Sequence, residues 1–131
     1  MPNRIKLIGD LLLVGEDQLG IAAEELLRET SLDSDPAFGS LLDSLEATPP
    51  PTSVEVAAIC AAWVVRNQPF FESNSKIAYL FMCLLLDEAG QPWKTSHEDA
   101  FVVPPIFEAV EAGEISEAEF VDWVCLRVAT A

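Results

Sequence analysis

The sequence predicts an all-α protein, a compact bundle of six to eight helices. Strand signals are scarce, because β-branched residues do not alternate with polar ones over any useful length. Apolar residues recur instead at three- and four-residue steps, which is the period of an α-helix. Half of the 131 residues are hydrophobic and the mean hydropathy is +0.27, values that argue against intrinsic disorder. We interpret residues 1–131 as a single domain, because a chain of this length rarely holds two.

The N-terminal part is expected to contain one or two helices between residues 5 and 28, since Gly15 and Gly20 weaken the middle of this segment. A loop rich in Ser and Asp follows over residues 30–36. A short helix with an apolar stripe is predicted over residues 37–47, and the run of prolines after it ends that helix.

Two further helices are predicted to form the centre of the fold. Thr52 and Glu55 have the spacing of a capping box, which begins an alanine-rich helix ending near Asn67. The helix predicted over residues 75–89 is apolar on nearly every side, a composition that indicates burial. Gly90 is suited to end it, because the residue after a helix often adopts a left-handed conformation.

Two capping boxes are also predicted in the C-terminal part. Thr95 and Glu98 would open one helix, which the prolines at 104–105 must kink or break. Ser116 and Glu119 would open the last helix, which continues to the end of the sequence.

The charge balance limits the classes of partner. The sequence contains seven Lys and Arg residues and 22 Asp and Glu residues, so the formal net charge is −15. A nucleic-acid-binding role is excluded on this basis, because no basic surface is available to replace the counterions of phosphates. We expect a protein partner that is basic or neutral. No segment resembles a secretion signal or a membrane span, so we expect a cytoplasmic protein without membrane association.

The three cysteines, Cys60, Cys83 and Cys125, lie in apolar helical patterns. An odd number without close pairing indicates reduced, buried thiols and not a disulfide framework. His97 is the only histidine, so a metal site with nitrogen ligands or a cysteine–histidine nucleophile finds little support.

The segment over residues 67–78 is a polar turn that leads into the N-terminus of a buried helix. The first amides of a helix lack intrahelical partners and carry partial positive charge, so this turn has the features of an anion site. Lys76 adds a cation, Glu72 can cap the helix or hold a divalent metal, and Asn74 can cap or donate to phosphate oxygens. The plainer interpretation is that Ser73 or Asn74 is an ordinary N-cap and that Lys76 is a solvated side chain.

The same segment resembles the signature loop of the Fic/Doc superfamily, His-x-Phe-x-Asp/Glu-Gly-Asn-Gly/Lys-Arg. The matching positions are Phe70, Glu72 and Asn74. The altered positions are Gln68 for the histidine, Ser73 for the glycine and Lys76 for the arginine, and Ser75 fills the Gly/Lys position. Residues 40–47 and 111–123 also resemble segments of death-on-curing (Doc) proteins, so the similarity covers about residues 37–128.

The resemblance implies a compact helical bundle that transfers a phosphoryl group or AMP from ATP to a protein hydroxyl. It implies that Glu72 holds Mg²⁺ and that Ser73, Asn74, Ser75 and Lys76 contact the nucleotide phosphates. Doc toxins act on elongation factor Tu and are neutralised by an antitoxin segment that folds against them. The resemblance therefore implies an antitoxin-like segment or a target protein as partner.

The most important departure is Gln68, which occupies the position of the histidine that acts as general base. A carboxamide is not basic near neutral pH, and general-base catalysis contributes about 10²–10⁴-fold to a rate. Ser73 adds a side chain where phosphate approaches, and Lys76 lacks the bidentate fork of arginine. We expect a degenerate Doc-like protein with lost or strongly reduced transfer activity. The alternatives are an active transferase that uses another base and an acidic protein-interaction module that binds no nucleotide.

Overall fold

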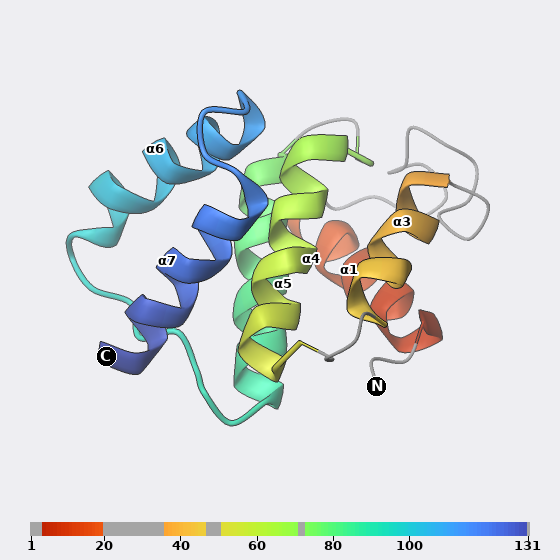
Figure 1. Cartoon of the computed structure of the whole chain (residues 1–131), viewed down its shortest axis with the longest axis horizontal. Helices are drawn as coiled ribbons and strands as arrows, with labels where there is room; N and C mark the ends of the chain where they lie inside the picture. Colours follow the sequence, from red (N-terminus) through yellow and green to blue (C-terminus); the bar gives the residue numbers. More distant parts are fainter. Residues whose placement is uncertain (1–3, 20–35, 47–50, 71–72, 131) are drawn as a thin grey trace.

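The computed structural model describes residues 4–19, 36–46, 51–70 and 73–130, and this part of the chain contains helices and no strand (Figure 1). The predictions of an all-α fold and of six to eight helices are confirmed for the described residues. The helices are α1 (Arg4–Leu19), α3 (Pro36–Leu45), α4 (Ser53–Asn67), α5 (Asn74–Glu88), α6 (Asp99–Glu111) and α7 (Glu117–Thr130).

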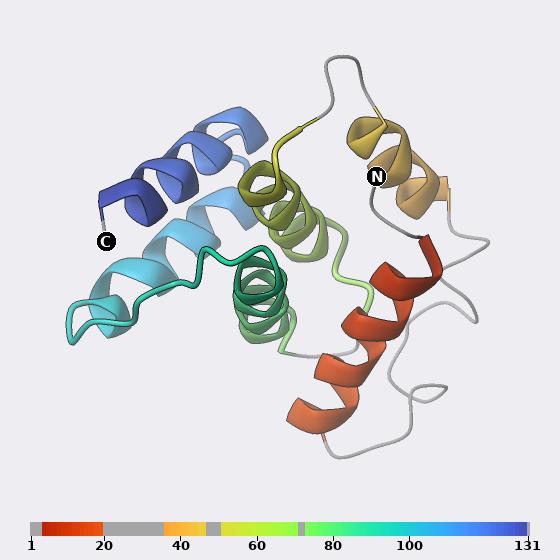
Figure 2. The ribbon, with the colours of Figure 1, turned by 90° about the horizontal axis from the view of Figure 1, so that it is seen from below.

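Helices α4 and α5 lie side by side at the centre of the fold. Helices α6 and α7 pack on one side of this pair and α1 and α3 on the other, as the two perpendicular views show (Figures 1 and 2). Helix α4 contacts α3, α5, α6 and α7, as expected of the alanine-rich helix. Four alanines of α4 are completely buried, which allows its neighbours to approach closely: Ala57, Ala58, Ala61 and Ala62.

The predicted start and end of α4 are confirmed. The backbone N–H of Glu55 donates to Thr52 Oγ1 at 3.2 Å, and the N–H of Thr52 donates to Glu55 Oε1 at 2.9 Å. The helix ends at Asn67, and the N–H of Gln68 closes the last turn by donating to the carbonyl of Val64 at 2.9 Å.

The N-terminal predictions are tested only in part. Helix α1 runs without interruption through Gly15, and residues 20–28 and 30–35 lie outside the described residues. Pro36 is the first residue of α3 and does not belong to the preceding loop. This is a favourable place for proline, because the first residue of a helix has no intrahelical use for its N–H.

Helix α5 ends as predicted, and Gly90 adopts the left-handed conformation with φ +77°. The expectation that α5 is buried on all sides is wrong, because Leu80, Leu84 and Leu85 remain partly exposed. Its neighbours cover the face that carries Ile77, Ala78, Phe81, Met82 and Leu86.

The predicted capping box at Thr95 and Glu98 is wrong by one residue. The backbone N–H of Ser96 donates to Asp99 Oδ2 at 3.2 Å, and Ser96 Oγ donates to Asp99 Oδ1 at 3.0 Å. Glu98 makes no side-chain capping bond. The shift places Asp99 on the inner side of α6, where it is buried and gains further partners.

Helix α6 is continuous through Pro104 and Pro105, so of the predicted kink or break the break does not occur. A proline removes the hydrogen bond to the carbonyl four residues earlier, here Ala100 and Phe101. Both of these residues are exposed, so water can satisfy their carbonyls. The last helix begins as predicted, with Ser116 and Glu119 forming both bonds of their capping box at 3.1 Å.

The described cysteines are free thiols. Cys60 is buried as predicted, whereas Cys83 and Cys125 are only partly buried and pack against the hydrophobic core. Within the described ranges, no helix combines the length and apolarity needed to cross a bilayer.

Candidate functional site

Gln68 lies at the end of α4, at the turn that leads towards α5. Its backbone is left-handed, with φ +46° and ψ +62°. Its side-chain amide Nε2 donates to Glu111 Oε1 at the end of α6, so the carboxamide is engaged with a carboxylate. Gln68 thus joins the α4–α5 turn to α6, two parts of the chain 43 residues apart.

Asn74 and Phe70 hold the turn together from the inside. The backbone N–H of Phe70 donates to Asn74 Oδ1 at 3.0 Å, and Asn74 Nδ2 donates to the Phe70 carbonyl at 3.0 Å. The Phe70 side chain is completely buried, and Asn74 is 8% exposed. Asn74 is therefore the first residue of α5 and not its N-cap, and its side chain holds the backbone of Phe70.

Ser73 is the N-cap residue of α5, and its side chain makes no capping bond. Its φ of +61° places it in the left-handed region, which an ordinary side chain adopts at a cost and a glycine adopts freely. Ser75 and Lys76 follow in the first turn of α5, and Lys76 is exposed. Glu72, the predicted metal ligand, lies outside the described residues.

A pocket of about 390 Å³ lies between α5 and α6. Its wall is almost entirely apolar. Helix α5 contributes Ser75, Lys76 and Tyr79, and the apolar part of the α6 wall comes from Val103, Pro104 and Phe107. The structure thus brings two predicted phosphate contacts, Ser75 and Lys76, to one pocket, whereas Gln68 is not among the residues that line it.

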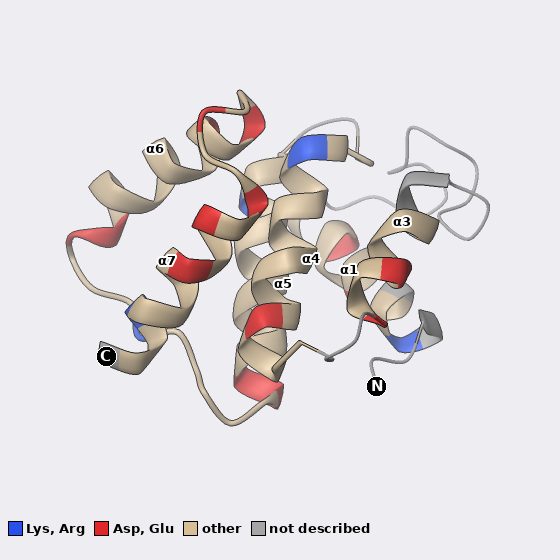
Figure 3. Cartoon of the chain, in the orientation of Figure 1, with Lys and Arg blue, Asp and Glu red and all other residues tan. Residues whose placement is uncertain are grey.

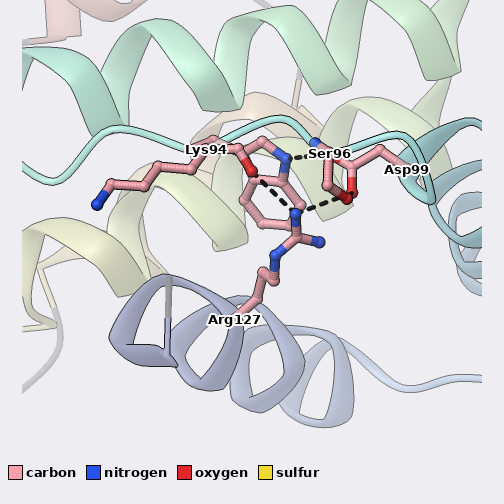
Figure 4. A network of polar contacts seen from close by, with 5 residues as sticks. Lys94, Ser96, Asp99 and Arg127 are labelled. Carbon is pink, nitrogen blue, oxygen red and sulfur yellow. Dashed lines mark hydrogen bonds and ion pairs between the residues drawn. The ribbon is translucent and has the colours of Figure 1, made fainter.

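Asp99 lines this pocket and is also the centre of a network of polar contacts. Figure 4 shows this network. Asp99 Oδ2 accepts a hydrogen bond from Trp93 Nε1 at 3.0 Å, and Asp99 Oδ1 accepts one from Arg127 Nη2 at 2.8 Å. Arg127 Nη2 also donates to the carbonyl of Lys94 at 2.9 Å, and its guanidinium lies 4.6 Å from the centroid of the Trp93 ring. Burial acts to raise the pKa of Asp99, but the hydrogen bonds from Trp93, Arg127 and Ser96 outweigh it and lower that pKa.

This network is not predictable from the local sequence. Ser96 and Asp99 have the spacing of a capping box, but so does the overlapping pair Thr95 and Glu98, and the spacing alone does not choose between them. Nothing local to Arg127 identifies its partner, which lies 28 residues earlier in the sequence.

The thiols are poorly suited to nucleophilic chemistry. Burial, with a smaller contribution from Glu117, raises the pKa of Cys60 to about 12, and burial also raises the pKa of Cys83 and of Cys125. A raised pKa leaves little reactive thiolate near neutral pH. In the part of the chain that the structure describes, no group of three or more His, Cys, Asp or Glu side chains is arranged to hold a metal ion.

No protein-family model matches the sequence, and no curated protein is significantly similar to it. The resemblance to Fic/Doc proteins therefore depends on the residues of the turn and its flanking segments.

Proposed function

We propose that this chain is a degenerate Fic/Doc-like protein, a toxin-type scaffold of the kind found in toxin–antitoxin systems. Its phosphoryl or AMP transfer to protein hydroxyls is lost or strongly reduced, and it acts in the cytoplasm by binding a protein. The partner is an antitoxin-like segment or the former target protein.

The observation that carries this proposal is the state of Gln68. The resemblance places the general base at this position, and the side chain present is a carboxamide whose nitrogen donates to Glu111. An amide nitrogen in this role has no lone pair to accept a proton from a substrate hydroxyl. Gln68 therefore cannot abstract a proton, because a carboxamide is not basic and because its nitrogen already donates to Glu111.

The backbone of the turn supports the kinship. Ser73 occupies the glycine position of the motif, and its φ of +61° is a conformation that favours glycine. Phe70 and Asn74, which match the motif, are the two buried residues that hold the turn in place. A turn that retains this shape with a less suitable residue at Ser73 is consistent with descent from a functional loop.

The fit of ATP and Mg²⁺ to this turn is partial. If ATP is bound, Ser75 and Lys76 in the first turn of α5 would contact its phosphates, and the N-terminus of the helix would favour their charge. The side chain of Asn74 already bonds both the N–H and the carbonyl of Phe70. The metal would supply charge neutralisation at the phosphates, with Glu72 as its expected ligand.

A labelling assay tests the proposal. The protein is incubated with elongation factor Tu and with ATP labelled at either the γ- or the α-phosphate, which separates phosphoryl from AMP transfer. We expect no incorporation above a control without the protein. Robust labelling of the target by the unmodified chain overturns the proposal and favours an active transferase that uses another base.

The distribution of charge favours a second candidate, an acidic interaction module. Carboxylates are spread over α6, α7 and the turn between them (Figure 3), where Glu108, Glu111, Glu114 and Glu119 are exposed. A surface of this kind attracts a basic partner over about 8 Å at physiological ionic strength. This function predicts partner binding that weakens with salt, and binding that is unchanged at high salt contradicts it.

A further inference from the structure

We propose that the pocket between α5 and α6 binds a small apolar carboxylate, such as a medium-chain fatty acid. The hydrocarbon part would lie against the wall formed by Val103, Pro104 and Phe107, and the carboxylate would lie near Lys76. This site does not require transfer chemistry, although it shares Ser75 and Lys76 with the phosphate contacts of the proposed function.

The size and composition of the pocket indicate an apolar ligand. Its volume of about 390 Å³ falls at the lower end of the range for small-molecule sites, roughly 300–1,000 Å³. Phe107 and Tyr79, whose ring centroids lie 6.2 Å apart, add aromatic surface from α6 and α5. Removing the hydrocarbon of a ligand from water against such a wall is the main source of affinity.

Lys76 indicates that the ligand is an anion. The exposed Lys76 contributes to the wall, and a lysine can line apolar surface with its methylene groups while its ammonium stays in water. Among the described residues, no carboxylate forms an ion pair with Lys76. The N-terminus of α5 adds partial positive charge at the same place.

Asp99, the other charged residue of the wall, does not offer a comparable site for a cation. Its carboxylate accepts hydrogen bonds from Trp93, Ser96 and Arg127, and Arg127 Nη2 at 2.8 Å offsets its charge. The charge available to a ligand in the described wall is therefore that of Lys76. A ligand with an apolar body and one carboxylate is complementary to both features of the pocket.

Isothermal titration calorimetry with octanoate and its neutral isostere octanamide tests the proposal on the full chain. We expect octanoate to bind with one-to-one stoichiometry and octanamide to bind more weakly. Lys76→Ala should weaken octanoate binding about three- to fivefold more than it weakens octanamide binding, because both ligands lose the same methylene contacts and octanoate alone also loses an exposed ion pair. Lys94→Ala is the matched control, because it removes the same charge from an exposed residue that does not line the pocket.

A second set of measurements places the ligand in the molecule. Ala100→Trp adds a large side chain at an exposed position of the wall and should abolish binding, with circular dichroism confirming that the helices are intact. Amide chemical-shift changes in the unmodified protein should concentrate at Tyr79, Val103 and Phe107, a result that requires no variant. The proposal is overturned if octanoate does not bind, if the shifts lie elsewhere, or if octanoate and octanamide bind equally well. The labelling assay contains no fatty acid, so its outcome decides the proposed function separately.

Discussion

Arg127 Nη2 lies 2.8 Å from Asp99 Oδ1, and this contact joins the last helix to the start of α6. The Asp99 side chain is 8% exposed and that of Arg127 is 23% exposed, so the pair is largely removed from water. The same carboxylate holds the indole N–H of Trp93 at 3.0 Å. One acidic residue thus fixes the connector before α6 and the C-terminal half of α7.

Replacing Arg127 with alanine should lower the free energy of unfolding by about 3 kcal/mol, because it leaves a buried carboxylate without its charged partner. Urea denaturation followed by circular dichroism measures this change. Arg66→Ala is the control: Arg66 is exposed and donates to the carbonyl of Ile115 at 3.1 Å, so its loss should cost less than about 1 kcal/mol. Equal losses for the two variants would contradict a special role for the Asp99 pair.

The lowered pKa of Asp99 predicts a specific acid sensitivity. A carboxyl whose pKa is lower in the folded state stabilises the fold above its unfolded pKa of about 3.9, and this stability is lost as pH falls through the folded value. Asp99→Asn should remove this component, so its unfolding free energy should change less below about pH 4 than that of the unmodified protein. Urea midpoints measured between pH 7 and pH 2 test this, and parallel curves for the two proteins would refute it.

Replacing Asn74 with alanine should lower the free energy of unfolding by about 2–4 kcal/mol, because both the N–H and the carbonyl of Phe70 lose a buried partner. Hydrogen exchange at the Phe70 amide should accelerate in parallel. Asn67→Ala is a matched change, since Asn67 makes one bond to the Trp63 carbonyl at 2.9 Å from an exposed position. A loss at Asn74 no larger than that at Asn67 would mean that the two hydrogen bonds between Asn74 and Phe70 contribute little to stability.

Ser73→Gly should raise the free energy of unfolding by about 0.5–1 kcal/mol, because it relieves a left-handed conformation that disfavours a side chain. Ser75→Gly, two residues later inside α5, should instead destabilise by about 0.5–1 kcal/mol. Thermal unfolding of both variants gives the two signs in one experiment. A destabilising Ser73→Gly would show that this turn does not have the geometry of a glycine position.

The double substitution Gln68→His with Lys76→Arg should restore measurable transfer if only the chemistry of the turn has been lost. General-base catalysis contributes about 10²–10⁴-fold, so labelling of elongation factor Tu should rise from background to a readily detected level. Gln68→Asn with Lys76→Arg is the control, because it alters the same positions without adding a base. Labelling by both double variants would show that the gain in transfer does not come from the imidazole.

The helix boundaries that depend on local signals were predictable, and those that depend on contacts were not. Thr52 with Glu55, and Ser116 with Glu119, form capping boxes because the interacting groups lie three residues apart. At the start of α6 two overlapping pairs compete, and the burial of Asp99 beside Arg127 and Trp93 selects the second. For the candidate site, the sequence was enough to predict which residues form the turn, but it was not enough to predict which residues they contact.

The all-α class, the central position of the alanine-rich helix and the carboxamide at position 68 could be read from the amino-acid sequence. These follow from composition, periodicity and the identity of single side chains. The tertiary contacts determine that Gln68 meets Glu111, that the side chain of Asn74 bonds the backbone of Phe70 and that residues of α5 and α6 line a pocket beside Lys76. The reason is that such contacts join residues distant in sequence, or direct one side chain among several choices, and only the packing of the helices fixes which atoms meet.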